Sequence, residues 1–524
     1  MPRGHTDSVA PSPPGWARPR LAATAAAGLA VTLLATGCGT DADETGDATL
    51  SVGVAGGSAS DTIDGHIAVD NTDIARTFAL YDTLTEFSDD FTVQMALAES
   101  VEPNEDATEW TVTLREDLHF SDGEPITADD VAFSMERIID PDDPKTGATA
   151  LDGLNPEEIE VVDERTVTLG FDDGFVHLPE ILAEYYNAIV PEGYDPDEPV
   201  SSGPFAYESF EPGERSVFVR NEHYWREDQP QIEELEIVNF PDDTSRVNAL
   251  IGGQVDVISQ VPHAQIDTIA SDTDLEILES ETGMWLPFTM RVDREPFDDV
   301  RVRQAFRLIV DREEMVEQAL SGYGTVANDL YSPYDPAYAE DIPQREQDID
   351  EARELLAEAG YEDDLTVELV TGPINTGAVE SAQVFAEQAA EAGVTVELRE
   401  VTSEEFYGDN YLEWDFAQDF WGTRNYMSQA AQGTMPDAPF NETHWDHEEW
   451  TELVEEAKGT VDDEERAELL RAAQEIEHEE GGLIVWGFVN LVDAHHSDVQ
   501  GFEESATGHP LTSYGFHRVQ IDGS

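Results

Sequence analysis

One arginine stands out among the residues that can hold a ligand. The stretch WGTRNY places Arg424 three residues after Trp421 and directly before Asn425 and Tyr426. A guanidinium offers a planar fork of donors to a carboxylate or a backbone carbonyl, and it also stacks on aromatic rings such as those of Trp421 and Tyr426. The alternative is an ion pair between Arg424 and Asp419. We favour the ligand-binding interpretation.

Residue sets that perform catalysis do not appear in the sequence. His444 and His447 stand three residues apart, a spacing that can place two imidazoles on one helical face and hold a metal. We favour the other interpretation of this segment, the start of a helix with an exposed acidic face. The sequence contains no serine nucleophile elbow, phosphate-binding loop or cysteine nucleophile. We therefore expect a protein that is not an enzyme and has no cofactor and no metal site.

The composition is that of a globular protein with an extreme acidic charge. The 524 residues include 115 acidic and 26 basic side chains, which gives a formal net charge of −89. Such a charge is typical of some disordered chains, but aromatic and aliphatic residues that can build cores run through the whole sequence. Binding of cations or basic partners is one explanation of the charge. We favour the other, a solvated surface suited to high salt.

This interpretation predicts a dependence of stability on salt. At roughly 1 M salt the Debye length is about 3 Å, so repulsion between surface carboxylates is largely screened. The melting temperature should therefore rise between low salt and molar salt. Thermal melts that stay level across this range would contradict the halophilic interpretation.

The N-terminal region has the pattern of an exported lipoprotein. A positively charged start is followed by the apolar run LAATAAAGLAVTLLA, which is too short to span a bilayer and is typical of a signal peptide. The run ends at LLATGC, which resembles a lipobox and contains the only cysteine, Cys38. We expect residues 1–37 to be a signal peptide, Cys38 to carry the lipid, and residues 38–48 to be an acidic tether. The alternative is an unmodified thiol near a cleavable leader.

The mature chain alternates predicted strands and helices. A first strand from Thr49 breaks on glycines into a loop, and Trp110 begins an alternating apolar strand. Thr127, with Asp130 three residues on, has the pattern of a helix start. Strand, helix and strand then recur in two parts of the chain, with an interruption near residues 250–290. The pattern predicts an α/β protein with two lobes and a ligand cleft between them.

Four long blocks carry a family resemblance. WTVTLREDLHFSDGEPITADDV, SSGPFAYESFEPGERSVFVRNEHYW, EPFDDVRVRQAFRLIVDREEMV and ARELLAEAGY occur in this order. They resemble the extracytoplasmic solute-binding proteins of ABC transporters, family 5, the peptide and oligopeptide type. The resemblance covers roughly residues 50–516.

The resemblance implies a fold and a domain plan. The fold is the two-lobe class II fold of periplasmic binding proteins, with an extra subdomain inserted in lobe I. Lobe I is expected to comprise residues 49–284 and 489–524, with the inserted subdomain at about 74–201. Lobe II is expected to comprise residues 285–488.

The resemblance also implies ligand-binding residues. In the family the tryptophan that corresponds to Trp421 faces the ligand, and dipeptide binders follow it with an aspartate that holds the ligand's ammonium group. Here Arg424 and Asn425 stand in that zone, which argues against a simple dipeptide site. The family's loop after the first strand contributes to the site, and Ser58 and Ser60 are the candidates there.

Two further candidates complete the predicted site. Trp285 stands where lobe II is expected to begin, and it either lines the cleft or packs into the core. Tyr426 is the second aromatic candidate beside Arg424.

The resemblance implies a receptor that captures peptides or peptide-like solutes outside the cell and delivers them to an ABC permease. Alternatives left open are a non-peptide solute, such as a metal chelate or a sugar, and a sensing role without transport. We expect a monomer that is anchored to the cell membrane by lipid, faces the extracellular or periplasmic side, and has no nucleic-acid partner.

Overall fold

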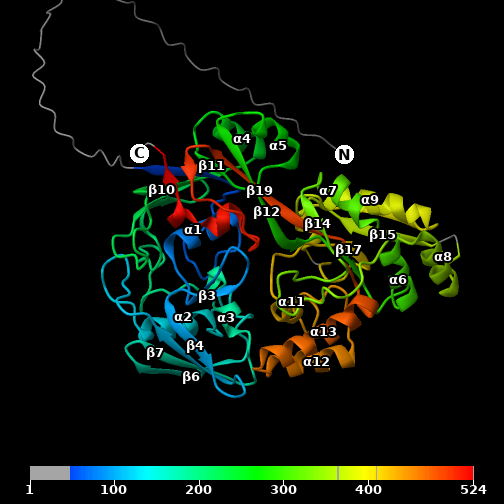
Figure 1. Ribbon diagram of the computed structural model, residues 1–524, viewed down its shortest axis with the longest axis horizontal. Helices are drawn as coiled ribbons and strands as arrows, with labels where there is room; N and C mark the ends of the chain where they lie inside the picture. The colour runs from blue at the N-terminus through cyan, green and yellow to red at the C-terminus, as the bar shows by residue number, and fades with distance from the viewer. Residues whose placement is uncertain (1–47, 363–364, 409, 523–524) are drawn as a thin grey trace, which may run out of the picture. The chain divides into compact units, whose positions relative to one another are not determined.

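The computed structural model describes residues 48–362, 365–408 and 410–522. Its helices and strands are labelled in Figure 1. The predicted signal peptide, the lipidation site Cys38 and nearly all of the predicted tether lie outside the described residues.

The largest sheet among the described residues has eight strands, in the order β12-β19-β11-β1-β10-β9-β8, with β14 also pairing with β19. These strands are β1 (Thr49–Ala55), β8 (Phe205–Glu211), β9 (Arg215–Arg220), β10 (Glu234–Phe240), β11 (Val257–Ile258), β12 (Leu275–Trp285), β14 (Gly324–Val326) and β19 (Gly487–His496). β1 lies between β10 and β11 and is parallel to both. Its inward side chains, Leu50, Val52 and Val54, are fully buried. The sheet therefore carries the core of the first lobe.

Helices and short elements complete this lobe. They are α1 (Asn71–Leu80), α4 (Asp243–Ile251), α5 (His263–Ala270), α14 (Pro510–Tyr514), η2 (Phe516–Arg518), β20 (Val499–Gln500) and β21 (Gln520–Ile521). The turn residues Glu211, Pro212 and Gly213 between two apolar stretches predict a hairpin. It is confirmed as β8 and β9, which pair antiparallel.

A four-stranded antiparallel sheet, in the order β4-β5-β7-β6, interrupts the first lobe in the described chain. Its elements and neighbours are β2 (Thr85–Phe87), β3 (Val93–Met95), β4 (Ala98–Pro103), β5 (Glu109–Leu114), α2 (Ala128–Ile138), β6 (Leu154–Asp163), β7 (Thr166–Phe171), α3 (Leu178–Ile181) and η1 (Tyr185–Asn187). The predicted start of α2 is confirmed, because the backbone N–H of Thr127 donates to Asp130 Oδ2 at 2.8 Å.

The second lobe has its own five-stranded sheet within the described residues, in the order β16-β15-β17-β13-β18. Its elements are β13 (Phe288–Met290), α6 (Val300–Ile309), α7 (Arg312–Ala319), α8 (Ile349–Glu358), β15 (Thr366–Thr371), α9 (Ala378–Glu391), β16 (Thr395–Glu400), α10 (Ser403–Phe406), β17 (Phe416–Gln418), α11 (Tyr426–Gly433), α12 (Glu448–Lys458), α13 (Asp463–Glu480) and β18 (Leu483–Ile484). The predicted β-α-β unit is confirmed: β15 and β16 are parallel and joined by α9. The two sheets have separate apolar cores, so the predicted two-lobe α/β fold is confirmed.

Two long antiparallel strands, β12 and β19, run from the first lobe toward the second (Figure 1). At one end of their ladder Trp285 pairs with Phe488. The lobe boundaries that we predicted from the sequence, 284/285 and 488/489, fall at this pair. The division of the chain at these residues stays a prediction.

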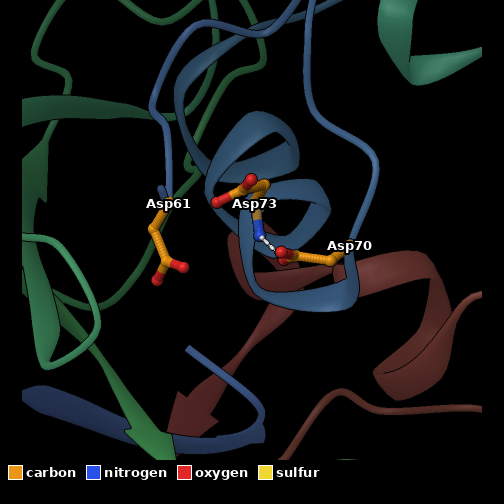
Figure 2. A group of neighbouring side chains, drawn as sticks. All are labelled: Asp61, Asp70 and Asp73. Carbon is orange, nitrogen blue, oxygen red and sulfur yellow. Dashed lines mark hydrogen bonds between the residues drawn. The ribbon is translucent and has the colours of Figure 1, made fainter. Parts of the chain in front are cut away.

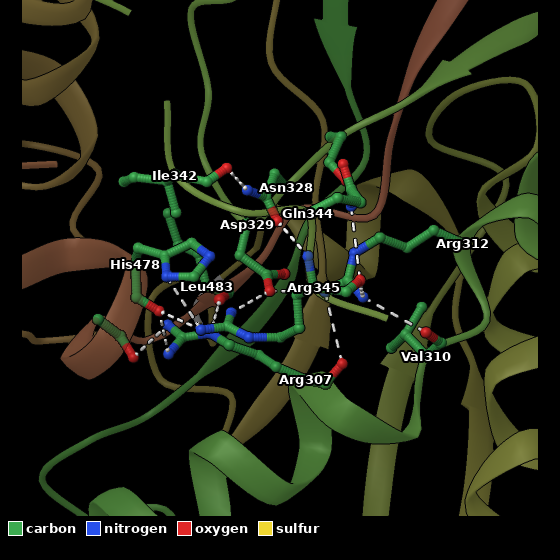
Figure 3. A network of polar contacts seen from close by, with 12 residues as sticks. Arg307, Val310, Arg312, Asn328, Asp329, Ile342, Gln344, Arg345, His478 and Leu483 are labelled. Carbon is green, nitrogen blue, oxygen red and sulfur yellow. Dashed lines mark hydrogen bonds and ion pairs between the residues drawn. The ribbon is translucent and has the colours of Figure 1, made fainter. Parts of the chain in front are cut away.

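A buried network of arginines joins α6 to the end of α13 (Figure 3). Arg307 is fully buried and donates to the backbone carbonyls of Leu483 at 2.9 Å and Gly481 at 2.7 Å. Arg303 donates to the carbonyl of Phe297 at 2.8 Å. Asp298, Asp299 and Asp311 stand close to these arginines in the sequence, a pattern that predicts exposed ion pairs. This prediction is wrong for Arg303 and Arg307, which are buried. A helix end leaves carbonyls without partners, and these guanidiniums satisfy several of them.

The same network contains an ion pair that is shielded from water. Asp329, whose side chain is fully buried, binds Arg312 Nη2 at 2.6 Å and also pairs with Arg345. Burial acts to raise the pKa of Asp329, but Arg312 and Arg345 outweigh it and lower this pKa to about 2. The pair holds the loop that follows β14 against α7.

Within the described ranges, no helix has both the length and the apolar character needed to span a bilayer.

Candidate ligand-binding site

The segment from Trp421 to Tyr426 connects β17 to α11 and is fixed at its first residue. The backbone of Trp421 exchanges two hydrogen bonds with that of Trp285, at 3.0 and 3.1 Å. Their side chains stack with 6.3 Å between ring centroids and an angle of 17°. Trp421 is therefore held at the end of β12, where the chain enters the second lobe.

Arg424 lies over the ring of Trp421, with its guanidinium carbon 5.4 Å from the ring centroid. The side chain is half-buried. Among the arginines of the described residues, Arg424 alone has neither a hydrogen bond nor an ion pair. Asp419 instead accepts hydrogen bonds from the hydroxyls of Tyr407 at 2.5 Å and Tyr411 at 3.1 Å. The pair between Arg424 and Asp419 that we considered from the sequence is therefore absent from the described residues.

Residues from two other parts of the chain lie near this guanidinium. Burial raises the pKa of Glu184 to about 7, and the positive charge of Arg424 acts in the opposite direction. Burial, together with the positive charge of Arg424, lowers the pKa of His509 to about 4. The ring of His509 is therefore neutral at neutral pH. Tyr185 and Tyr186 also lie within the electrostatic reach of Arg424.

A cavity of about 80 Å³ opens next to the segment from Trp421 to Tyr426 and is lined by Thr423 of the second lobe together with residues of the first lobe and its insertion. Arg424, which follows Thr423, is not itself part of the lining. The lining includes Phe78, Asp82, Glu86, Glu184, Tyr185, Arg226, His509, His517 and Arg518. Aromatic walls with a small number of polar groups are typical of small-molecule sites.

The remaining predicted site residues lie in three different environments. Trp285 is 2% exposed and stacks on Tyr331 with 5.4 Å between ring centroids. Tyr426 is also in the core, where its hydroxyl donates to Glu477 Oε2 at 2.6 Å. Asn425 precedes α11 and lines a separate cavity of about 290 Å³.

The two serines after β1 are exposed. The hydroxyls of Ser58 and Ser60 lie 2.7 Å apart and share a hydrogen bond. Neither residue lines a cavity described here. The structure thus brings Trp421 and Arg424 into contact next to Thr423, which lines the cavity of about 80 Å³, and leaves these serines apart from it. The roles of all seven residues in binding stay predictions.

Sequence reasoning missed Glu184 and His509. Each lies in a segment far from Arg424 in the chain, and neither belongs to a motif with a known ligand spacing. Glu184 precedes a single 3-10 turn, and His509 precedes α14. The sequence offered no signal that these residues meet Arg424.

Three carboxylates near the start of α1 are close enough to one another to attract a cation. The oxygens of Asp61, Asp70 and Asp73 lie within 4.8 Å of one another (Figure 2). However, Arg76 is fully buried among them and donates to Asp61 Oδ2 at 3.0 Å and to Asp73 Oδ1 at 2.6 Å. Asp70 caps α1 by accepting from the backbone of Asp73 at 3.0 Å. Arg76 and backbone N–H groups therefore already occupy oxygens of this cluster and compensate part of its charge.

The two-lobe α/β fold is of the class found in periplasmic solute-binding proteins. The family described as bacterial extracellular solute-binding proteins, family 5, matches residues 92–439. The chain belongs to this family, whose relatives are the solute-binding proteins of ABC transporters.

Two curated relatives and one solved structure illustrate the range of the family. The glutathione-binding protein GsiB of Salmonella typhimurium is 27% identical over 474 residues, covering 87% of this chain and 92% of GsiB. Heme-binding protein A of Haemophilus influenzae is 28% identical over 491 residues, covering 85% of this chain and 87% of that protein. The structure of DppA from Helicobacter pylori in complex with the peptide STSA matches with a TM-score of 0.74 at 20% identity, covering 91% of this chain and 99% of DppA.

Proposed function

We propose that this protein is the lipid-anchored receptor of an ABC importer and captures peptides or peptide-like solutes outside the cell. The observation that carries the proposal is the free guanidinium of Arg424, which directly follows the cavity-lining residue Thr423. A half-buried guanidinium without acceptors forgoes strong charge-assisted hydrogen bonds. A ligand carboxylate or peptide carbonyl would supply these acceptors. The ring of Trp421 would hold the guanidinium in place through the cation–π contact.

The size of the cavity bears on how a peptide enters. A volume of about 80 Å³ has room for several water molecules but falls below the range of roughly 300–1,000 Å³ that is usual for ligand sites. In the described conformation the cavity accepts a group about the size of one side chain. A larger solute needs the lobes to separate, which is the hinge motion of two-lobe binding proteins.

The lipid anchor rests on the sequence around Cys38. Its acyl chains would insert into the membrane at about 0.8 kcal/mol per buried CH₂ group. Delivery to the permease follows from membership of the family.

Peptide binding can be tested with pools of candidate ligands. Pools of di-, tri- and tetrapeptides should raise the melting temperature and change the tryptophan fluorescence, because Trp421 lies against Arg424. The control is a set of sugars and metal chelates at the same concentrations. A response to the control set alone would favour the non-peptide alternative. No change of melting temperature or fluorescence with any peptide pool would contradict the peptide proposal.

A further inference from the structure

Glu184 is an acidic side chain without a partner. It stands just before η1, and its carboxylate makes no capping hydrogen bond. Among the described residues it has no side-chain hydrogen bond and no ion pair. It nevertheless lines the cavity of about 80 Å³. Glu184 is half-buried, and a carboxylate that is partly removed from water without a partner is destabilised.

The other charged groups of the cavity are satisfied within the described residues. Asp82 Oδ2 accepts from Trp225 Nε1 at 2.5 Å. Glu86 and Arg226 pair at 2.5 Å, and Arg518 pairs with an aspartate outside the cavity at 2.8 Å.

The two histidines of the cavity wall carry no charge at neutral pH. Burial lowers the pKa of His517 to about 3 and that of His509 to about 4. In the described part of the chain Glu184 is therefore the one carboxylate that lines the cavity without a hydrogen bond or ion pair. Arg424, which follows the lining residue Thr423, is the unpaired group of opposite sign.

The two free groups do not neutralise each other by contact. Arg424 belongs to the second lobe and Glu184 to the insertion of the first, and the structure records no ion pair within 4.0 Å between them. Their charges interact only over a longer distance. A ligand that carries both charges itself would meet the free carboxylate on the cavity wall and the free guanidinium that follows the lining residue Thr423.

We propose that the ligand is a zwitterion whose cationic group binds the carboxylate of Glu184 and whose carboxylate binds the guanidinium of Arg424. This inference rests on the proposed function and deepens it, because it names the charges of the solute and its direction in the cleft. The ligand's anionic end lies against the second lobe. Its apolar body packs beside Phe78, Tyr185 and His509, whose rings contact one another at 5.4 to 6.1 Å between centroids.

Two matched sets of four probes test the inference by thermal melts and titration calorimetry. The peptide set is dialanine, N-acetyl-dialanine, dialanine amide and the doubly blocked peptide. The non-peptide set is 6-aminohexanoic acid, hexanoic acid, hexylamine and hexanol. The zwitterion of at least one set should bind the wild-type protein about tenfold or more tightly than its singly charged partners.

Substitution of Glu184 tests whether this carboxylate binds the cationic group of the ligand. Glu184→Gln should remove the advantage of the zwitterion over the N-acetylated or amine-free probe, whereas Glu184→Asp should retain part of it. The matched control is Glu198→Gln, since Glu198 is exposed and lines no cavity described here. Equal binding of blocked and free amines by the wild-type protein, or an unchanged preference in Glu184→Gln, would overturn the inference.

The effect of pH provides an independent readout. Binding of dialanine should weaken as the pH falls from 7.5 to 5.5, because Glu184 becomes protonated and loses its charge. The peptide amine gains charge over the same range, so loss of the ligand's charge does not explain the weakening. Arg424 and the neutral His509 do not titrate in this range, and burial raises the pKa values of Tyr185 and Tyr186 above their usual range. The dependence should become clearly smaller in Glu184→Gln. Part of it can remain, because burial raises the pKa of Asp82, another lining carboxylate, to about 6. An undiminished dependence in this variant would contradict the role of Glu184.

The outcomes separate the inference from the proposed function. If peptides bind whether or not their amine is blocked, the inference fails and peptide binding stands. If only 6-aminohexanoic acid binds, peptide binding fails and the zwitterion site stands. If no probe of either set binds, both are contradicted.

Discussion

Replacing Arg424 with alanine is expected to weaken ligand binding by about 10- to 100-fold, because a charge-assisted hydrogen bond contributes about 1.5–3 kcal/mol. The empty protein should lose little stability. In the described residues Arg424 makes only the contact with the ring of Trp421, and a partly exposed contact of this kind contributes about 0.5–1 kcal/mol. Titration calorimetry and thermal melts measure the two effects separately.

The matched control for this variant is Arg471→Ala. Arg471 is exposed on α13, and its one hydrogen bond in the described residues goes to the carbonyl of Pro336 at 3.4 Å. This control should leave both affinity and melting temperature nearly unchanged. If Arg424→Ala instead destabilises the empty protein and leaves affinity intact, the arginine has a structural role only.

The substitution with the largest expected effect on stability is Asp329→Asn. The carboxylate is fully buried between Arg312 and Arg345 (Figure 3). Removing one partner of a buried ion pair leaves uncompensated charge and typically costs about 3–5 kcal/mol. Denaturant unfolding of the variant should show this loss, while Asp350→Asn, which removes an exposed pair with Arg353 at 3.3 Å, should cost less than about 1 kcal/mol.

The pH dependence of stability provides a second test of Asp329. Its pKa in the folded protein, about 2, is lower than the usual value of 3.8. The carboxylate therefore stabilises the fold above pH 3.8, and this contribution of about 2 kcal/mol is lost as the pH falls through 2. The difference in unfolding free energy between wild type and Asp329→Asn should shrink over this range. A difference that stays constant would contradict the ion-pair account.

Local patterns predicted much of the fold. Alternation of apolar residues and the turn at Pro212 predicted the hairpin of β8 and β9, and Thr127 with Asp130 predicted the start of α2. These features depend on neighbours in the sequence. The burial of Arg303 and Arg307 was not predictable in this way, because their partners are carbonyls at the end of α13, far along the chain.

Only the part of the candidate site that comes from one short segment of the sequence was predictable. Arg424 and Trp421 are close in the sequence, so their contact could be proposed from spacing and chemistry. Glu184 and His509 come from segments more than eighty residues away on either side, and only the folded chain brings them near the guanidinium. The position of Tyr426, which points into the core toward Glu477, likewise depends on how α11 packs.

The central claim is that the protein binds a peptide or peptide-like zwitterion at Arg424. Native mass spectrometry of protein purified from its source without refolding tests this claim most directly. The account predicts a bound species that fragments as a peptide or a peptide-like compound with a free amine and a carboxylate, and that is lost or strongly reduced in Arg424→Ala. A wild-type protein carrying a sugar, a metal chelate or no ligand, or an Arg424→Ala variant with undiminished ligand, would contradict it.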